Sequence, residues 1–175
     1  GDPVFEPRLA TASPLRAIMA DGAHLPLLVF EAENPRAVVL GLHGFNDYSN
    51  TFGTFGPGAY LADRGIAVYA MDQRGFGGAP GRGLWAGSTR MAEDAATAVA
   101  LLRKRHPGIP LYVIGTSMGG AVAMMTAAAA PERVVKAALV EGFTPLTTPE
   151  EDAGAQLRRG LASTLRYRNG ENRPH

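Results

Sequence analysis

The sequence predicts an α/β fold with a mostly parallel sheet and helices on both faces. Short apolar runs of strand length alternate with helical patterns along the 175 residues, as in parallel strands joined by crossover helices. Residues 37–43 (AVVLGLH) form a continuous apolar run, which is typical of a strand buried on both faces. The polar and glycine-rich motifs follow directly after such runs, where the carboxyl ends of parallel strands form the ligand-binding edge.

The order of the expected elements follows from apolar periodicity and from the positions of glycine and proline. Residues 1–14 hold three prolines and are expected to be irregular. We expect strands at 25–31, 37–43, 66–72, 110–115 and 134–141, and helices at 51–64 (broken early by glycine and proline), from an N-cap at Ser88 to Pro107, and at 118–130. Residues 1–141 then form the core, and residues 142–175 form an atypical tail with a helix at 149–167.

Composition excludes several functional classes. The net charge is +1 and no basic stripe is present, so nucleic acid is not an expected partner. Cysteine is absent, which excludes disulfides, thiol catalysis and cysteine-based metal sites. No apolar run approaches the roughly 20 residues that a transmembrane helix needs. We assign no metal site, and the compartment stays open between cytoplasmic and, after loss of a signal peptide, periplasmic or secreted.

The motif with the most chemical content is Gly115-Thr116-Ser117-Met118-Gly119-Gly120. It lies between an expected strand and an expected helix, where a sharp turn would lift the Ser117 hydroxyl above the sheet into a cleft. The helix N-terminus beneath it favours developing negative charge. We therefore expect Ser117 to be a nucleophile, although the same pattern can occur by chance in a chain with 22 glycines.

A second motif, His43-Gly44-Phe45-Asn46, directly follows the strand expected at 37–43. Gly44 permits a tight turn that points backbone N–H groups toward the same edge. The N–H groups of Phe45 and Met118 could together hold an acyl oxyanion. His43 is more readily explained as a brace for this loop than as a general base.

The third motif, from Asp72 to Gly77 (DQRGFG), follows the strand expected at 66–72. A dinucleotide-binding fingerprint is rejected because Pro80 occupies its third glycine position and no helix opens there. Asp72 and Arg74 are expected to pair and to fix the loop, a structural role that we favour over a catalytic one.

These three motifs, in this order, resemble α/β-hydrolases of the monoacylglycerol lipase and lysophospholipase group, which are also described as serine aminopeptidase-like. The runs HGFNDYSNTF, DQRGFGGAPGRG and GTSMGGAVA carry the resemblance, which covers about residues 20–141. It implies that Ser117 is the nucleophile, that Phe45 and Met118 supply the oxyanion donors, and that the substrates are carboxylic esters, often of lipids. It also implies that no cofactor is used.

The acid and base of a catalytic triad have no matching positions in the sequence. In the family a lid, a strand ending in Asp and a loop bearing His follow the sixth strand, so the chain is expected to be a C-terminally truncated or degenerate relative. His24, His43, His106 and His175 offer no clear base, and Glu141 is only a weak candidate for the acid.

Two functions therefore stay open at this point. One is a serine ester hydrolase with impaired activity. The other is a non-catalytic binding or interaction module on the same fold. Homo-oligomerisation is one way to cover the sheet edge that the absent strands would expose.

Overall fold

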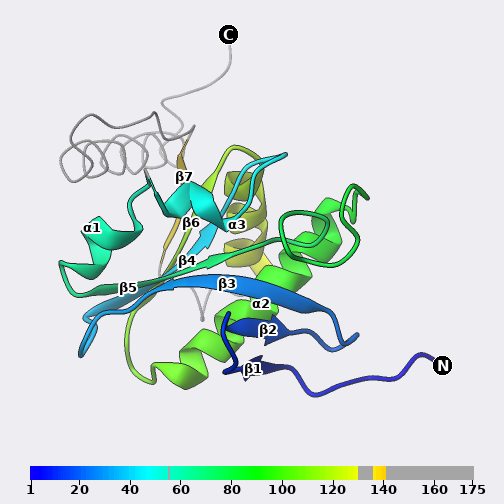
Figure 1. Cartoon of the computed structure of the whole chain (residues 1–175), viewed down its shortest axis with the longest axis horizontal. Helices are drawn as coiled ribbons and strands as arrows, with labels where there is room; N and C mark the ends of the chain where they lie inside the picture. The colour runs from blue at the N-terminus through cyan, green and yellow to red at the C-terminus, as the bar shows by residue number, and fades with distance from the viewer. Residues whose placement is uncertain (55, 130–135, 141–175) are drawn as a thin grey trace, which may run out of the picture.

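The computed structural model describes residues 1–54, 56–129 and 136–140, with backbone only for the last five. Its sheet has seven strands, in the order β1-β2-β3-β5-β4-β6-β7 (Figure 1). The strands are β1 (Arg8–Ala10), β2 (Arg16–Ile18), β3 (His24–Phe30), β4 (Ala37–Leu42), β5 (Ile66–Met71), β6 (Leu111–Thr116) and β7 (Lys136–Val140). The helices are the 3-10 turn η1 (Ser49–Phe52), α1 (Gly58–Ala62), α2 (Ser88–Arg105) and α3 (Met118–Ala129).

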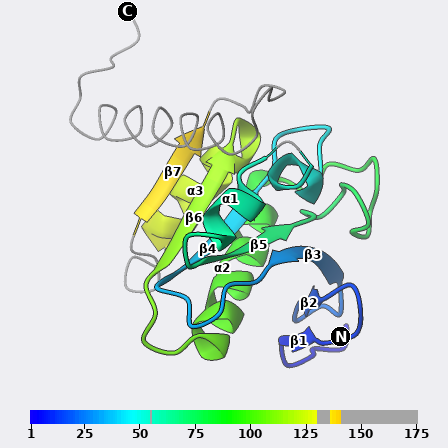
Figure 2. The same cartoon turned by 60° about the vertical axis from the view of Figure 1, so that its left-hand side comes forward.

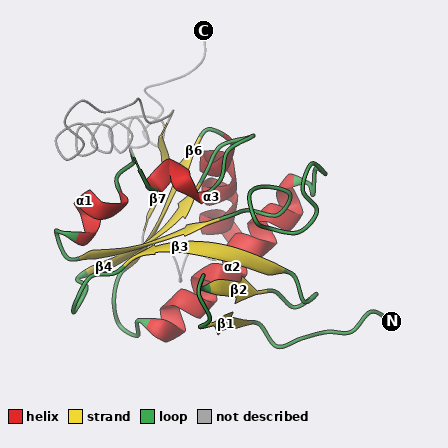
Figure 3. Cartoon of the chain, in the orientation of Figure 1, coloured by secondary structure: helices red, strands yellow, loops and turns green. Residues whose placement is uncertain are grey.

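The sheet has a parallel half and an antiparallel half (Figure 3). Strands β5, β4, β6 and β7 are parallel, with Leu40 of β4 lying between Tyr69 of β5 and Val113 of β6. Strands β1, β2 and β3 pair antiparallel with one another, and β3 pairs antiparallel with β5. The parallel core confirms the predicted fold class, and the antiparallel half makes the complete sheet a mixed one.

Helices cover both faces of the sheet, as predicted (Figure 2). Because side chains alternate along a strand, Leu40 and Leu42 point to the face packed by α2 and α3, whereas Val39 points to the other. On the α2 side the core includes Met91 and Leu102, which lie on one stripe of that helix. The apolar run at residues 37–43 therefore serves both layers.

Three local expectations are corrected. Residues 1–14 are not irregular throughout, because β1 lies within them and pairs with β2. The helix expected over 51–64 is divided into η1 and α1, with the break at the expected glycines and proline. Ser88 is the first residue of α2 rather than its N-cap; Gly87 takes that position, with a φ of +91° and no side-chain cap.

Candidate active site

The turn at Ser117 joins β6 to α3 at the carboxyl edge of the sheet. Ser117 has a φ of +51°, in the left-handed region that residues with a Cβ rarely adopt and that is common where an active site stores backbone strain. Its side chain is exposed. Its carbonyl oxygen accepts the N–H of Gly120 at 2.9 Å, which starts the hydrogen bonding of α3. The strand thus becomes a helix within one residue, and that residue is the serine.

Two glycines allow this turn to pack closely against its surroundings. A Cβ at Gly119 would collide with the carbonyl oxygens of Leu42 and His43, and a Cβ at Gly115 would collide with the backbone of Gly119. The obstructing atoms are backbone atoms, which cannot rotate away. The small residues of the motif therefore set the distance between α3 and the ends of β4 and β6.

The loop after β4 lies directly beside the serine. A Cβ at Gly44 would lie 3.4 Å from Thr116 Oγ1 and 3.5 Å from Ser117 Cβ. The amide N–H groups of Phe45 and Met118 donate no hydrogen bond among the described residues. The N–H groups of Phe45 and Met118, which follow Gly44 and Ser117 in the chain, are thus two unpaired backbone donors. An oxyanion site needs donors of this type.

His43 is buried beneath this loop with both ring nitrogens engaged. Nδ1 lies 2.8 Å from the carbonyl oxygen of Gly44 and donates to it, and Nε2 accepts the backbone N–H of Gln73 at 3.0 Å. The Gln73 amide group in turn donates to the His43 carbonyl at 2.8 Å. Because Nε2 accepts an N–H, it carries no proton and the ring is neutral, and burial lowers the pKa of His43 in the same direction. No lone pair remains free to take a proton from Ser117.

Asp72 and Arg74 fix the loop after β5, but not by pairing with each other. The Asp72 carboxylate accepts the N–H groups of Ser49 at 2.8 Å and Gly78 at 2.9 Å. Arg74 instead forms a bidentate pair with Asp94 of α2, with both N–O distances at 2.9 Å. The expected Asp72–Arg74 pair is therefore replaced by two separate anchors, which tie the loop to η1 and to α2.

A second carboxylate, from Asp21, completes the environment of Arg74. Arg74 donates to the Asp21 oxygens at 2.6 and 3.2 Å. The Arg74 hydrogen bond is the main cause that lowers the pKa of Asp21 to about 2, and the bond to Asp94 is the main cause that raises the pKa of Arg74. Burial raises the pKa of Asp94, and the Arg74 charge opposes that effect. Arg74 thus joins the β2–β3 turn, the loop and α2.

Aromatic rings connect this loop to the loop after β4. Phe76 meets His43 edge-on with centroids 5.3 Å apart, and it meets Phe45 edge-on at 5.6 Å. Trp85 also contacts Phe45, with ring centroids 6.1 Å apart. Phe45, which presents one candidate oxyanion donor, is therefore in contact with two aromatic side chains from residues 73–87.

Among the described residues, neither of the other two histidines, His24 and His106, contacts Ser117. His24 is the exposed first residue of β3. His106 precedes β6, and its Nε2 lies 2.7 Å from the Tyr69 hydroxyl. Ser117 follows the other end of this six-residue strand, about 20 Å along the chain. His175, Glu141, and the tail with its expected helix at 149–167 lie outside the described residues.

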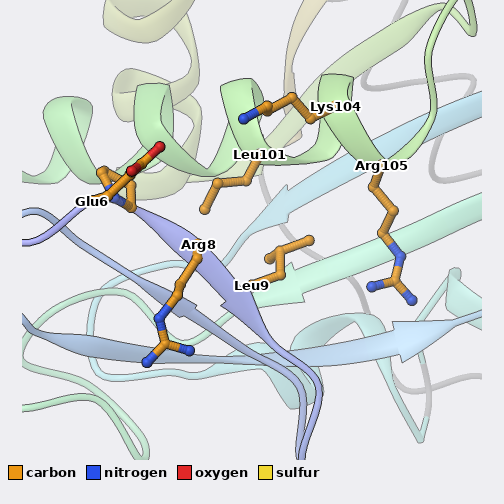
Figure 4. Close-up of a pocket in the computed structure, with 7 residues that line it drawn as sticks. Glu6, Arg8, Leu9, Leu101, Lys104 and Arg105 are labelled. Carbon is orange, nitrogen blue, oxygen red and sulfur yellow. The ribbon is translucent and has the colours of Figure 1, made fainter.

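A shallow cavity of about 440 Å³ lies apart from this edge, between β1 and the last turn of α2. Figure 4 shows its lining, which includes Leu9, Leu101 and the charged side chains of Arg8, Lys104 and Arg105. The last turn of α2 leads into the amino end of β6, so a cavity beside that turn lies toward the amino ends of the parallel strands. It does not contain the candidate nucleophile.

Two further properties concern only the described part of the chain. No helix there is long and apolar enough to cross a bilayer. No group of three or more histidine or carboxylate side chains gathers there as it would around a metal ion.

Sequence reasoning missed Gln73, Asp94 and Trp85. Asp94 had a detectable signal, because it lies three residues after Met91 on the apolar stripe of α2 and a carboxylate there needs a partner. Gln73 and Trp85 had no comparable signal, since their contacts join segments far apart in the sequence.

Similar proteins match most of the chain. The family model described as serine aminopeptidase, S33, matches residues 33–169, which includes much of the segment after residue 141. Human monoglyceride lipase is 27% identical over 76% of this chain and 44% of its own length. Monoacylglycerol lipase of Mycolicibacterium smegmatis is 32% identical over 51% of this chain and 31% of its own length. The chain therefore spans less than half the length of these relatives.

Solved structures share the fold. A thermostable carboxyl esterase from Bacillus coagulans has a TM-score of 0.60 at 21% identity, covering 78% of this chain and 44% of its own. Est1E from Butyrivibrio proteoclasticus, bound to ferulic acid, has a TM-score of 0.60 at 21% identity, covering 69% of this chain and 49% of its own. Together with the serine turn and its parallel sheet, the family match over residues 33–169 shows that the chain belongs to the serine aminopeptidase S33 family of α/β-hydrolases.

Proposed function

We propose that this chain carries the nucleophile half of a serine hydrolase that cleaves carboxylic esters of lipids, such as monoacylglycerols or lysophospholipids. The observation that carries the proposal is an exposed serine at a φ of +51°, beside two backbone N–H groups that donate no hydrogen bond among the described residues. Relatives named monoglyceride lipase and monoacylglycerol lipase support a lipid ester as the substrate class.

The proposed reaction is acyl transfer to the serine. Ser117 Oγ attacks the ester carbonyl carbon, its proton passes to a base, and the carbonyl oxygen becomes an oxyanion held by the N–H groups of Phe45 and Met118. The alcohol leaves with a proton, and water then attacks the acyl-serine to release the acid and restore Ser117. One oxyanion donor typically lowers the barrier by about 2.7–4 kcal/mol.

The base is the component that the described residues do not supply. A serine hydroxyl without a base is a weak nucleophile at neutral pH, and the lone pair of His43 is already engaged by Gln73. Loss of a triad base lowers the rate of a serine hydrolase by about 10⁶. We therefore expect slow turnover from these residues alone, and Glu141 remains a proposal for the acid.

A non-catalytic binding module is the second candidate. It is favoured by one observation: among the described residues the Ser117 hydroxyl has no hydrogen-bond partner, although a primed nucleophile is bonded to its base. Self-association at the β7 edge of the sheet belongs to this alternative and remains a proposal.

Labelling with a fluorophosphonate tests the nucleophile. The probe should react slowly with the purified chain, and peptide mapping should place the adduct on Ser117. Ser117→Ala should abolish the adduct. Ser88→Ala, which changes another exposed serine at the start of a helix, should leave it unchanged.

The outcomes separate the two candidates. Fast, stoichiometric labelling that Ser117→Ala abolishes would show that a base is present. Labelling or ester hydrolysis that survives Ser117→Ala would remove Ser117 from the mechanism. No labelling, together with binding of a lipid ester by the intact chain, would favour the binding module.

A further inference from the structure

The tip of the loop between β5 and α2 exposes two large apolar side chains. Leu84 is 73% exposed and Trp85 is 57% exposed. The loop projects beyond the sheet, as the green segment between β5 and α2 shows (Figure 2). Adjacent large apolar side chains exposed at a projecting tip are a common feature of interaction sites.

The base of this loop is firmly held, so the tip is presented on a fixed support. Asp72 accepts the N–H of Gly78, and the Arg74–Asp94 pair anchors the first turn of the loop. The N–H of Gly83 donates to the carbonyl of Gly75 at 3.2 Å, which closes the loop on itself. The apolar tip therefore has little folded structure to rearrange before it can bind.

The tip is continuous with the candidate active site. The Trp85 ring contacts Phe45, and Phe45 is itself 61% exposed. Gly44 lies beside Ser117, and the next residue, Phe45, belongs to the same apolar surface as Trp85 and Leu84. The tip therefore connects, through Phe45, to the loop that lies beside the serine.

The chemistry of the tip selects among possible occupants. Side chains as exposed as Leu84 and Trp85 do not enclose a single acyl chain, whereas a lipid surface would cover them from several sides. Tryptophan favours the boundary between water and hydrocarbon because its ring is apolar and its N–H is polar. Arg82, two residues before Leu84, is exposed and takes part in no ion pair among the described residues. A free guanidinium beside an apolar tip is complementary to an anionic lipid surface.

We propose that Leu84, Trp85 and Arg82 dock the protein on the surface of an anionic lipid bilayer or aggregate, with the Phe45 and Ser117 edge facing the lipid. This proposal rests on the proposed function in one respect: hydrolysis of lipid esters at Ser117 gives the protein a reason to bind a lipid surface. The docking itself needs no catalysis.

Trp85 provides a direct reporter, because it is the single tryptophan of the chain. The full chain is mixed with vesicles of phosphatidylcholine and phosphatidylglycerol in equal amounts, and both Trp85 emission and co-sedimentation are measured. We expect the emission to shift to the blue and the protein to sediment with the vesicles. Ser117→Ala should bind equally well, so failure of the serine chemistry and failure of docking are distinguishable.

Substitutions test the named residues. Leu84→Asp should weaken vesicle binding by about tenfold or more, because a charged carboxylate replaces the leucine that would enter the lipid. Met124→Asp is the matched control, since Met124 is an exposed apolar residue on α3, and binding should be retained. Arg82→Gln should weaken binding to anionic vesicles about fivefold and leave binding to neutral vesicles unchanged.

Three results would overturn the proposal. The first is an unchanged Trp85 emission with vesicles, or equal binding by Leu84→Asp and the wild type. The second is a blue shift with monomeric short-chain esters but not with vesicles, which would make the tip an acyl-chain site. The third is lipid-free self-association that Leu84→Asp abolishes, which would assign the tip to a second copy of the chain.

Discussion

The turn at Ser117 and the loop at residues 73–87 meet at the same edge of the sheet but are held in different ways. The serine turn depends on backbone contact, because Gly119 lies against the carbonyl oxygens of Leu42 and His43. The loop depends on charged side chains, chiefly Arg74 between Asp94 and Asp21. One region therefore tolerates no added atom, whereas the other depends on partners that can be removed singly.

The largest effect is expected from Gly119→Ala. The added methyl group would enter the space of two carbonyl oxygens, so α3 could not keep its position against β4 and β6. We expect a loss of about 4 kcal/mol or more in the free energy of unfolding, or failure to fold. Urea unfolding followed by circular dichroism measures it.

Gly83→Ala is the matched control for this change. It adds the same methyl group at a φ of +82° where no atom lies within 4 Å, so only backbone strain of about 1–2 kcal/mol is expected. Gly119 lies in α3 without a positive φ, so a loss at Gly119→Ala no larger than that at Gly83→Ala would show that the contact with the two carbonyl oxygens does not limit residue 119.

The next effect concerns the side-chain anchor. Asp94→Asn removes the carboxylate that binds Arg74 at two points, and its side chain is only 3% exposed. Because the partly buried guanidinium loses its main partner, we expect a loss of about 2–3 kcal/mol. Glu93→Gln, a neighbouring exposed carboxylate paired with Arg90 at 3.6 Å, should change stability by less than about 0.5 kcal/mol.

Asp94→Asn also tests whether the loop at residues 73–87 positions Phe45. A loosened loop should free Trp85 from its contact with Phe45, so the Trp85 emission of folded Asp94→Asn should differ from that of the wild type. Unchanged stability and unchanged emission would mean that the loop is held without the Arg74–Asp94 pair.

The contrast between the two regions explains what the sequence could reveal. The serine turn was predictable because its requirement is local: Gly115, Ser117 and Gly119 lie within five positions, between a strand pattern and a helix pattern. The parallel core was predictable because buried strands leave continuous apolar runs. The loop partners were not, since Arg74 pairs with residues 20 and 53 positions away, and the nearer Asp72 was a plausible but wrong partner.

Two of the three antiparallel strands, β1 and β2, were missed for a related reason, whereas β3 was predicted as a strand. Strands β1 and β2 contain three residues each, too few to show a period of two in the sequence. Their stability comes from pairing with each other and with β3, and such pairing leaves no local signal. The prolines of residues 1–14 suggested an irregular segment instead.

Acid should destabilise the fold through the buried side chain of His43. Burial lowers the pKa of His43 below 6.5, so under pH 6.5 the unfolded chain binds a proton that the folded chain does not. Stability should therefore fall as the pH is lowered through this range, by at most about 1.4 kcal/mol per pH unit for this group. Urea midpoints measured at successive pH values test the direction.

His43→Gln should flatten this acid dependence, although it also lowers stability at neutral pH. His24→Gln is the control because that side chain is exposed, and it should retain the wild-type slope. A wild-type slope in His43→Gln would assign the acid sensitivity elsewhere, with His106 the next group to examine because burial also lowers its pKa.

The smallest effect is expected from Asp21→Asn. The Asp21 side chain is 36% exposed, so solvent screens its attraction to Arg74 and the loss should stay at or below about 1 kcal/mol. Asparagine can still accept the Ala23 N–H that Asp21 Oδ1 accepts at 3.1 Å, so the substitution removes charge more than local structure.

The pH and salt dependence of Asp21→Asn make this small effect measurable. Because Arg74 lowers the pKa of Asp21 from 3.8 to about 2, its contribution is present above pH 3.8 and disappears as the pH falls toward 2. The difference between Asp21→Asn and the wild type should thus vanish at the acid end of that range, and it should shrink in molar salt. A loss as large as that of Asp94→Asn, insensitive to salt, would mean that Asp21 and not Asp94 is the principal anchor of Arg74. The loop at residues 73–87 would then be held mainly by the β2–β3 turn and not by α2.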